Sequence, residues 1–392
     1  MGREAAAGAF RNVRLYTVST RGGPPRDLTG HYDRRAGATF LAPPSIDWSP
    51  DSRFIFITVV DHGRAPLVQI DTLGEPKIKR VTGGDNSVAS FTISKSGQLA
   101  YALSDMLHPN EVWITRSGRA YRLTQLNDSW LGELKLSPPK EIEIKSFDGR
   151  VLQGWVLRPP RASADEPLPT LLDVHGGPNL WFGHDATWFH LWQSFCARGY
   201  MVLCVNPRGS AGYGEEFGGL VRAGWGEGDF HDVMAAVDEV VARGWADPQR
   251  LMITGLSYGG FMTNWAIGHT DRFRAAISRG GISNFVSFPG TSDIRGPYGS
   301  PRQNMEKAVQ GSPLTFAASI QTPTLFSHGE TDYRVPITQS EELYQALQAR
   351  SVPTVMVRWP GQGHIPELLG PPKERVELAR MFLAWLDHYA KN

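Results

Sequence analysis

The chain has 392 residues, enough for two domains, and its 40 basic and 39 acidic residues leave a net charge of +1. No polybasic run or basic–aromatic stripe is present, which argues against a nucleic acid partner. No segment has the ~20 apolar residues that cross a bilayer, and residues 1–7 do not resemble a signal peptide, so no membrane association is expected.

The N-terminal third, residues 1–136, is rich in Thr, Val, Ile and Arg, without a helical period. Residues 46–52 precede a predicted strand at 54–60, and the similar residues 91–97 precede another at 99–103. The two copies lie about 45 residues apart, which is the length of a four-stranded propeller blade. We therefore predict a partial β-propeller of two to three blades, with a plain β-sandwich as the alternative.

The predicted strand 171–174 runs into the sequence His175-Gly176-Gly177-Pro178. Two consecutive glycines let the backbone turn an N–H inward without a Cβ clash. Pro178 has no N–H, so Gly177 is the better candidate for one donor of an oxyanion hole. An ordinary glycine turn is the alternative.

Residues 255–260 read G-L-S-Y-G-G, between a predicted strand at 250–254 and a predicted helix at 261–267. This strand–turn–helix context is that of the nucleophile elbow of an α/β-hydrolase. The pattern predicts Ser257 as the nucleophile. The backbone N–H of the next residue, Tyr258, is the second predicted oxyanion donor.

A serine nucleophile needs an imidazole base, and the imidazole needs a carboxylate to fix its tautomer. In α/β-hydrolases the acid and then the histidine follow the serine along the chain, each after a strand. Asp332 and His364 lie in this order, just past the predicted strands 323–327 and 353–359. His328 is the alternative base, although its position favours capping of a strand.

Taken together, these motifs resemble those of the prolyl oligopeptidase family of serine peptidases, in particular its acylaminoacyl-peptidase branch. The resemblance spans about residues 137–392, the predicted α/β-hydrolase domain. The matching segments are 141–149, 175–178, 206–214, 255–260, the loop at Asp332 and 361–364.

The resemblance implies that Arg334, two residues after the acid, binds a carbonyl of the substrate, as a guanidinium fork can do. A salt bridge within its loop is the alternative. Phe285 and Phe288 would line an apolar specificity pocket, or else belong to the core. The glutamates that bind a free amino terminus in the dipeptidyl branch have no identifiable counterpart, which argues against a strict dipeptidyl-peptidase.

The resemblance implies that relatives with this catalytic domain usually carry a complete propeller. Two or three blades leave an open sheet edge and apolar faces without a neighbour. We therefore expect either a truncated form or a homo-oligomer that covers the open edge.

The two cysteines, Cys196 and Cys204, fall on a predicted helix and strand without disulfide or metal spacing, which suits a cytoplasmic protein. No zinc-protease or P-loop motif is present, so no cofactor is expected.

The expected substrate is a small peptide, an acyl-amino acid or an ester. A peptidase of acyl-aminoacyl or short peptide bonds is the first reading, and a carboxylesterase with the same triad is the second. A non-catalytic interaction module is the third, and the intact set of Ser257, Asp332 and His364 argues against it.

Overall fold

The computed structural model describes residues 11–37, 45–116, 118–163, 166–222, 224–299 and 301–390. Residues 1–7, which do not resemble a signal peptide, lie outside these ranges. The chain divides into two compact units. The first contains residues 1–138 together with 179–190 and 209–220, and the second contains 139–178, 191–208 and 221–392. The predicted domains, 1–136 and 137–392, differ from these units chiefly by the two segments that group with the N-terminal part.

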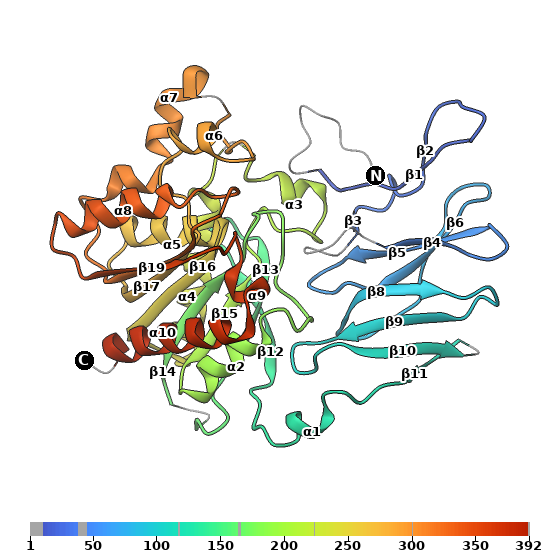
Figure 1. The fold of residues 1–392 in the computed structure, drawn as a ribbon, viewed down its shortest axis with the longest axis horizontal. Coiled ribbons are helices and arrows are strands. Elements are labelled where there is room, and N and C mark those ends of the chain that lie inside the picture. The colour runs from blue at the N-terminus through green and yellow to red at the C-terminus, as the bar shows by residue number, and fades with distance from the viewer. Residues whose placement is uncertain are drawn as a thin grey trace. The chain divides into compact units, whose positions relative to one another are not determined.

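The first unit consists mainly of antiparallel sheets (Figure 1). A five-stranded sheet runs in the order β3-β5-β6-β7, with β4 also paired to β5, and a four-stranded sheet runs β11-β10-β9-β8. Strands β1 and β2 form a separate pair. The bounds are β1 Tyr16–Thr17, β2 Arg26–Asp27, β3 Arg35–Ala36, β4 Ile46–Trp48, β5 Phe54–Val60, β6 Leu67–Asp71, β7 Ile78–Arg80, β8 Ser87–Ile93, β9 Leu99–Ser104, β10 Glu111–Arg116 and β11 Arg119–Arg122, with the short helices α1 Asp128–Leu131 and α3 Glu215–Gly219.

Alternating apolar residues join the sheets of this unit. Phe56 and Leu67 of the five-stranded sheet pack with Phe91 and Tyr101 of the four-stranded sheet. The opposite face of β5 and β6 packs against residues 11–36, through Leu15 and Leu28 among others. The predicted strand 54–60 coincides with β5.

The second unit is built on an eight-stranded sheet in the order β12-β13-β15-β14-β16-β17-β18-β19. The pairs β12–β13 and β13–β15 are antiparallel and the remaining pairs are parallel. The bounds are β12 Pro139–Lys145, β13 Val151–Leu157, β14 Leu168–Val174, β15 Met201–Val205, β16 Ala246–Leu256, β17 Phe273–Arg279, β18 Thr324–Gly329 and β19 Thr354–Trp359. This is the α/β-hydrolase domain expected from the sequence.

Helices pack against this sheet, and Figure 1 shows α10 as the long C-terminal helix. Helix α5 contacts β14, β16 and β17 at the centre of the sheet, and its residues 258–267 are all buried. A helix that is apolar on every side belongs in a core. The bounds are α2 Phe189–Ala197, α4 Gly228–Ala242, α5 Tyr258–His269, α6 Phe288–Thr291, α7 Pro301–Gln310, the 3-10 helix η2 Pro313–Phe316, α8 Thr338–Gln348, α9 Pro366–Leu369 and α10 Pro372–Ala390.

Candidate active site

Ser257 lies in the tight turn between β16 and α5. Its backbone has φ +63° and ψ −114°, a conformation that L-residues rarely adopt, and its N–H donates to the carbonyl of Arg279 at 2.8 Å. A Cβ on Gly259 would overlap the carbonyl oxygen of Val174, so only glycine fits there. The turn therefore holds Ser257 at the ends of β14, β16 and β17, where ligands of open α/β sheets bind.

Asp332 and His364 meet beside this turn. Nδ1 of His364 lies 2.7 Å from Oδ2 of Asp332, and since an ionised carboxylate can only accept, Nδ1 carries the proton. In the neutral ring Nε2 is then left with a free lone pair. A Cβ on Gly280, the residue after Arg279, would lie 3.6 Å from both Asp332 Oδ2 and His364 Nδ1, so the pair lies at the end of β17.

The Asp332 carboxylate is held on all sides. Its Oδ1 accepts the N–H groups of Arg334 and Val335, each at 2.9 Å, and its Oδ2 lies 3.2 Å from Nε2 of His328. Burial alone would raise the pKa of Asp332, but the hydrogen bonds from His328 and His364 outweigh it and hold the pKa below its usual value. Asp332 therefore stays ionised wherever His364 can act as a base.

His328, the alternative base, is a structural residue. Its side chain is fully buried, its Nε2 lies 2.7 Å from the carbonyl of Val335, and its Nδ1 lies 2.7 Å from the hydroxyl of Ser340. With both ring nitrogens engaged, it braces the loop of Asp332 instead of facing a substrate.

Gly177 and Tyr258 lie on adjoining segments, because Gly259 approaches the carbonyls of both Val174 and His175. Gly177 is exposed and has φ +122°. No hydrogen bond from the amide of Gly177 or of Tyr258 is found within the part of the chain that the structure describes. Both amides thus remain available to an oxyanion.

His175, which carries no predicted catalytic role, stabilises this loop. Its Nδ1–H donates to the carbonyl of Gly176 at 2.7 Å. Burial lowers its pKa to about 4, so the ring is neutral at pH 7.

The side chain of Tyr258 is anchored at the start of α4. Its hydroxyl donates to Oδ2 of Asp229 at 2.6 Å, and Oδ1 of Asp229 accepts the N–H of Gly226 at 2.9 Å. Burial raises the pKa of Asp229 and of Tyr258. Sequence reasoning missed Asp229, because nothing in the sequence pairs residues from two different crossover helices.

Phe285 and Phe288 are both buried and lie in a cluster of aromatic rings. The ring of Phe285 lies 5.7 Å from that of Trp225, which in turn lies 5.0 Å from Tyr258. The structure therefore places both rings in the core, the alternative given above, close to the residue that follows the nucleophile.

Arg334 is half-exposed and forms an ion pair with Asp293, with Nε 2.6 Å from Oδ1. This is the loop salt bridge weighed above as the alternative. An exposed ion pair of this kind is worth only ~0–1 kcal/mol, so it can open at small cost.

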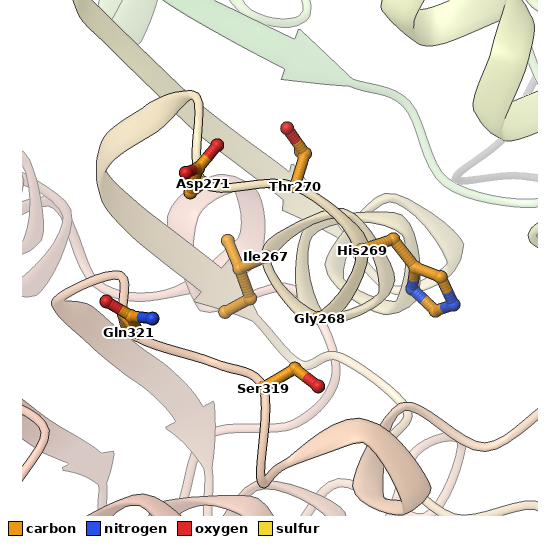
Figure 2. Close-up of a pocket in the computed structure, with 7 residues that line it drawn as sticks. All are labelled: Ile267, Gly268, His269, Thr270, Asp271, Ser319 and Gln321. Atoms are coloured by element: carbon orange, nitrogen blue, oxygen red, sulfur yellow. The ribbon is translucent and has the colours of Figure 1, made fainter.

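A separate hollow lies at the far end of α5 (Figure 2). Ser257 precedes the first residue of α5 and the hollow begins at Ile267, so about 15 Å of helix separates them. The hollow is therefore not part of the candidate active site. Its lining residues are Ile267, Gly268, His269, Thr270, Asp271, Ser319 and Gln321.

In the described residues, no group of three or more His, Cys, Asp or Glu side chains could hold a metal ion. Among the same residues, no helix is long and apolar enough to span a membrane.

The profile of the prolyl oligopeptidase family matches residues 187–392, which include Ser257, Asp332 and His364. The chain belongs to the prolyl oligopeptidase family. A similar family member is the uncharacterized peptidase YuxL of Bacillus subtilis, 38% identical over 87% of this chain and 53% of its own length. Dipeptidyl-peptidase 5 of Porphyromonas gingivalis is 29% identical over 88% of this chain and 52% of its own length.

Solved structures of this family are similar over nearly the whole chain. An acylaminoacyl peptidase in complex with Z-Gly-Gly-Phe-chloromethyl ketone superposes with a TM-score of 0.88 at 27% identity, covering 98% of this chain and 60% of that one. The Pyrococcus horikoshii acylaminoacyl peptidase gives 0.86 at 27% identity, with 97% and 59% covered. The chain spans about half the length of the two curated relatives named above.

Proposed function

We propose that the chain is a serine hydrolase that cleaves acyl-aminoacyl or short peptide bonds through an acyl-enzyme. The observation that carries the proposal is the His364–Asp332 pair, whose tautomer leaves Nε2 free as a base beside the strained Ser257. The similarity to acylaminoacyl peptidases supports the substrate class.

In the proposed mechanism, His364 Nε2 takes the proton of the Ser257 hydroxyl as the oxygen attacks the scissile carbonyl. The N–H groups of Tyr258 and Gly177 stabilise the oxyanion of the tetrahedral intermediate. His364 then gives its proton to the leaving amine, which departs as the acyl-enzyme forms. Water, deprotonated by His364, hydrolyses the acyl-enzyme and regenerates Ser257.

The substrate would be held on its acyl side by Arg334, once its exposed ion pair with Asp293 opens.

The proposal is tested by labelling with a fluorophosphonate probe. Ser257 is expected to react, and Ser257→Ala should abolish labelling and lower turnover ~10⁴–10⁶-fold. Ser319→Ala is the matched control, because Ser319 is an exposed serine that follows η2 and lines the separate hollow; this variant should keep both the labelling and the turnover. Labelling that persists in the Ser257→Ala variant would contradict the assignment.

A comparison of two substrates then separates peptidase from esterase. Turnover of an acetyl-amino-acid anilide supports a peptidase, whereas turnover of a short-chain aryl ester alone would favour the carboxylesterase reading.

We also propose that the two N-terminal sheets are blades of a partial propeller. Each holds four or five antiparallel strands, and they pack face to face through apolar side chains. Strand β11 is an edge strand whose four residues are all exposed. We infer that this edge pairs with a second copy of the chain.

Light scattering at micromolar concentration tests this pairing, and a mass equal to one chain at all concentrations would contradict it.

We further propose a cytoplasmic location, in keeping with two buried free thiols, Cys196 and Cys204. Fractionation of the source cells tests this, and recovery outside the cytoplasm would contradict it.

A further inference from the structure

His328 lies near the end of β18, and its side chain is fully buried. Its Nε2 lies 2.7 Å from the carbonyl oxygen of Val335 and 3.2 Å from Oδ2 of Asp332. A carbonyl oxygen and an ionised carboxylate can only accept, so Nε2 carries a hydrogen whether the ring is neutral or charged. His328 is therefore a hydrogen-bond donor to the acid of the candidate triad.

The two oxygens of Asp332 have different kinds of donor. Oδ1 accepts the backbone N–H groups of Arg334 and Val335, each at 2.9 Å. Oδ2 accepts the Nδ1–H of His364 at 2.7 Å and the longer contact from His328 at 3.2 Å. Two imidazole rings therefore share one carboxylate oxygen, while the backbone holds the other.

The sharing of Oδ2 has an electrostatic consequence for His364. The negative charge of Asp332 lies against Nδ1–H and so stabilises the protonated form of that ring. Burial acts to raise the pKa of Asp332, and the hydrogen bonds from His328 and His364 outweigh it. Because His328 takes up part of the charge on Oδ2, the protonated His364 ring is stabilised less than it would be by an unshared oxygen.

The other ring nitrogen of His328 anchors the side chain. Nδ1 lies 2.7 Å from Oγ of Ser340, a buried residue of α8. This contact does not involve Asp332, so it fixes the ring without acting on the carboxylate. Anchoring and the effect on the triad thus depend on different nitrogens of one ring.

The charged groups beside His328 belong to three elements. Asp332 follows β18 and lies at Nε2. Arg358 on β19 pairs in register with His328, and its guanidinium lies 2.9 Å from Oε1 of Glu330 and 2.6 Å from Oε1 of Glu341 in α8. The arginine is therefore already paired, which leaves Asp332 as the charged partner of the His328 ring.

The elements beside His364 carry two further ion pairs. Glu367, in the first turn of α9, lies 3.5 Å from the guanidinium of Arg279. Arg334, in the loop after Asp332, pairs with Asp293 at 2.6 Å. A substitution of His328 leaves both pairs in place, so a change in the His364 titration reports the contact with Asp332.

We propose that His328 is a positioning residue of the triad: its Nε2–H holds Oδ2 of Asp332 and takes up part of its charge, so that His364 becomes a free base at a lower pH. The inference rests on the proposed function, because that function makes His364 the base.

The test compares His328→Asn with His328→Gln. The amide nitrogen of asparagine lies as far along the side chain as Nδ1, whereas that of glutamine lies as far along as Nε2. His328→Asn therefore keeps a partner for Ser340 and loses the donor to Asp332. The acid limb of its kcat/KM pH profile should move up by about 0.5–1 pH unit, a loss of about 3–10-fold at pH values below the limb.

His328→Gln keeps a donor for Asp332 and should shift the acid limb by less than half as much. Ser340→Ala is the control for loosening of the ring, because it removes the anchor and leaves Nε2–H in place. It should lower the thermal unfolding midpoint without moving the acid limb. Equal shifts in His328→Asn and either of the other two variants, or no upward shift in His328→Asn, would overturn the proposal.

A readout on the parent protein needs neither turnover nor a folded variant of His328. In NMR spectra, the Nε2–H signal of His328 should change with pH at the midpoint of the His364 titration, because both rings donate to one oxygen. It is recognised as an imidazole N–H signal that persists in His364→Gln but loses this response. The absence of any such signal would overturn the proposal.

This measurement also keeps the two proposals apart. If the parent protein hydrolyses nothing, the proposed function fails, and the NMR titration still decides whether His328 and His364 act on the same carboxylate.

Discussion

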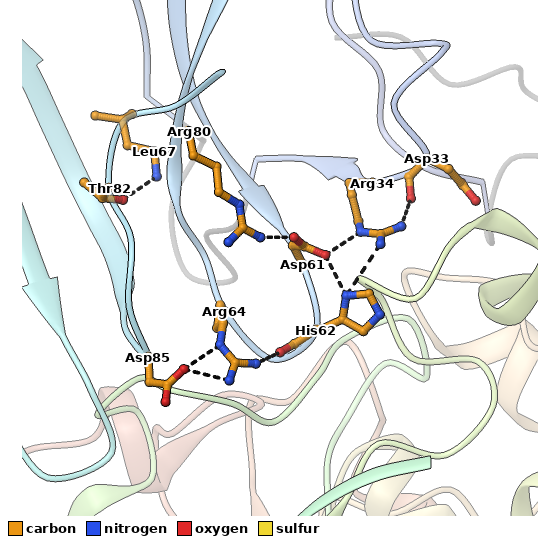
Figure 3. Close-up of polar contacts among 9 residues, drawn as sticks. All are labelled: Asp33, Arg34, Asp61, His62, Arg64, Leu67, Arg80, Thr82 and Asp85. Atoms are coloured by element: carbon orange, nitrogen blue, oxygen red, sulfur yellow. Dashed lines mark hydrogen bonds and ion pairs between the residues drawn. The ribbon is translucent and has the colours of Figure 1, made fainter. Parts of the chain in front are cut away.

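Two clusters of carboxyl groups and arginines, one in each unit, lie in different surroundings. In the first unit, Asp61 pairs with Arg34 and Arg80 and also contacts His62 (Figure 3). One carboxylate has two guanidinium partners there, and the Arg80 side chain is 46% exposed. In the second unit two carboxyl groups, those of Asp173 and Glu367, share the single guanidinium of Arg279, and all three side chains are buried. The pKa of Asp61 is lowered in the first cluster, which water can screen, whereas burial raises the pKa of Asp173 and of Glu367 in the second.

The comparison predicts that changes near the buried cluster alter catalysis and that changes at Asp61 alter only stability. The largest effect on turnover is expected from His364→Ala, which removes the proposed base. We expect a loss in turnover of about 10³–10⁶-fold with the fold intact. In the parent enzyme, activity should fall as an imidazole protonates, around the reference value of ~6.5. Circular dichroism and a pH–rate profile check both, and near-full activity in the variant would place the base elsewhere.

The next largest effect is expected from Tyr258→Phe. The change leaves the Asp229 carboxylate buried without its hydroxyl donor, which should cost about 1–3 kcal/mol of unfolding free energy. The variant keeps the backbone N–H of residue 258, the proposed oxyanion donor, but loses the hydrogen bond to Asp229 that anchors this residue, so kcat should also fall. The double variant Tyr258→Phe with Asp229→Asn should recover part of the stability in urea unfolding. An additive loss of stability would show that the two side chains are not coupled.

Arg334 offers an intermediate case, because it forms an exposed ion pair with Asp293 and is also a predicted substrate-binding residue. Arg334→Ala should lower kcat/KM by about tenfold or more on an acetyl-amino-acid anilide but little on a simple acetate ester, which lacks the second carbonyl. Asp293→Ala is the control, because it opens the same ion pair and leaves the guanidinium free. It should keep or raise activity on the anilide. Similar losses in both variants would show that the ion pair only holds the loop.

The smallest effect is expected at Asp61. Its hydrogen bonds with His62 and Arg34 outweigh burial and lower its pKa. A carboxyl with a lowered pKa stabilises the fold above its unfolded pKa, ~3.9, and loses this contribution as the pH falls through the folded value. Asp61→Asn should therefore cost about 1–2 kcal/mol at pH 7, discounted for the exposed arginines. In urea unfolding the difference from the parent should shrink below pH 4, with turnover unchanged at pH 7. A difference independent of pH would rule out the charge as its source.

The parts of the fold that follow local rules could be predicted from the sequence. The strand Phe54–Val60 was predicted with both ends correct, and β14, β16, β18 and β19 were placed within a few residues. The family was identified from motifs at the ends of these strands. Such signals are local, because a buried strand followed by a glycine turn is visible in ten residues.

The contacts between distant segments could not be predicted. The cluster of Asp173, Arg279 and Glu367 joins the ends of β14 and β17 with α9, and no spacing rule connects them. No pattern in the sequence pairs Asp293 with Arg334, although the two form an ion pair in the structure. The grouping of 179–190 and 209–220 with the N-terminal unit depends on contacts with residues such as Gly63, which only the folded chain brings together.

The close approach of Gly259 to Val174 has a consequence for how the chain folds. The turn that strains Ser257 can form only after β14 and β17 have both docked on β16, because the carbonyls of Val174 and Arg279 define its space. Nucleophilic reactivity should therefore arise late in refolding, after most secondary structure. The rate of covalent labelling during refolding would then report assembly of the central sheet, independently of any optical signal.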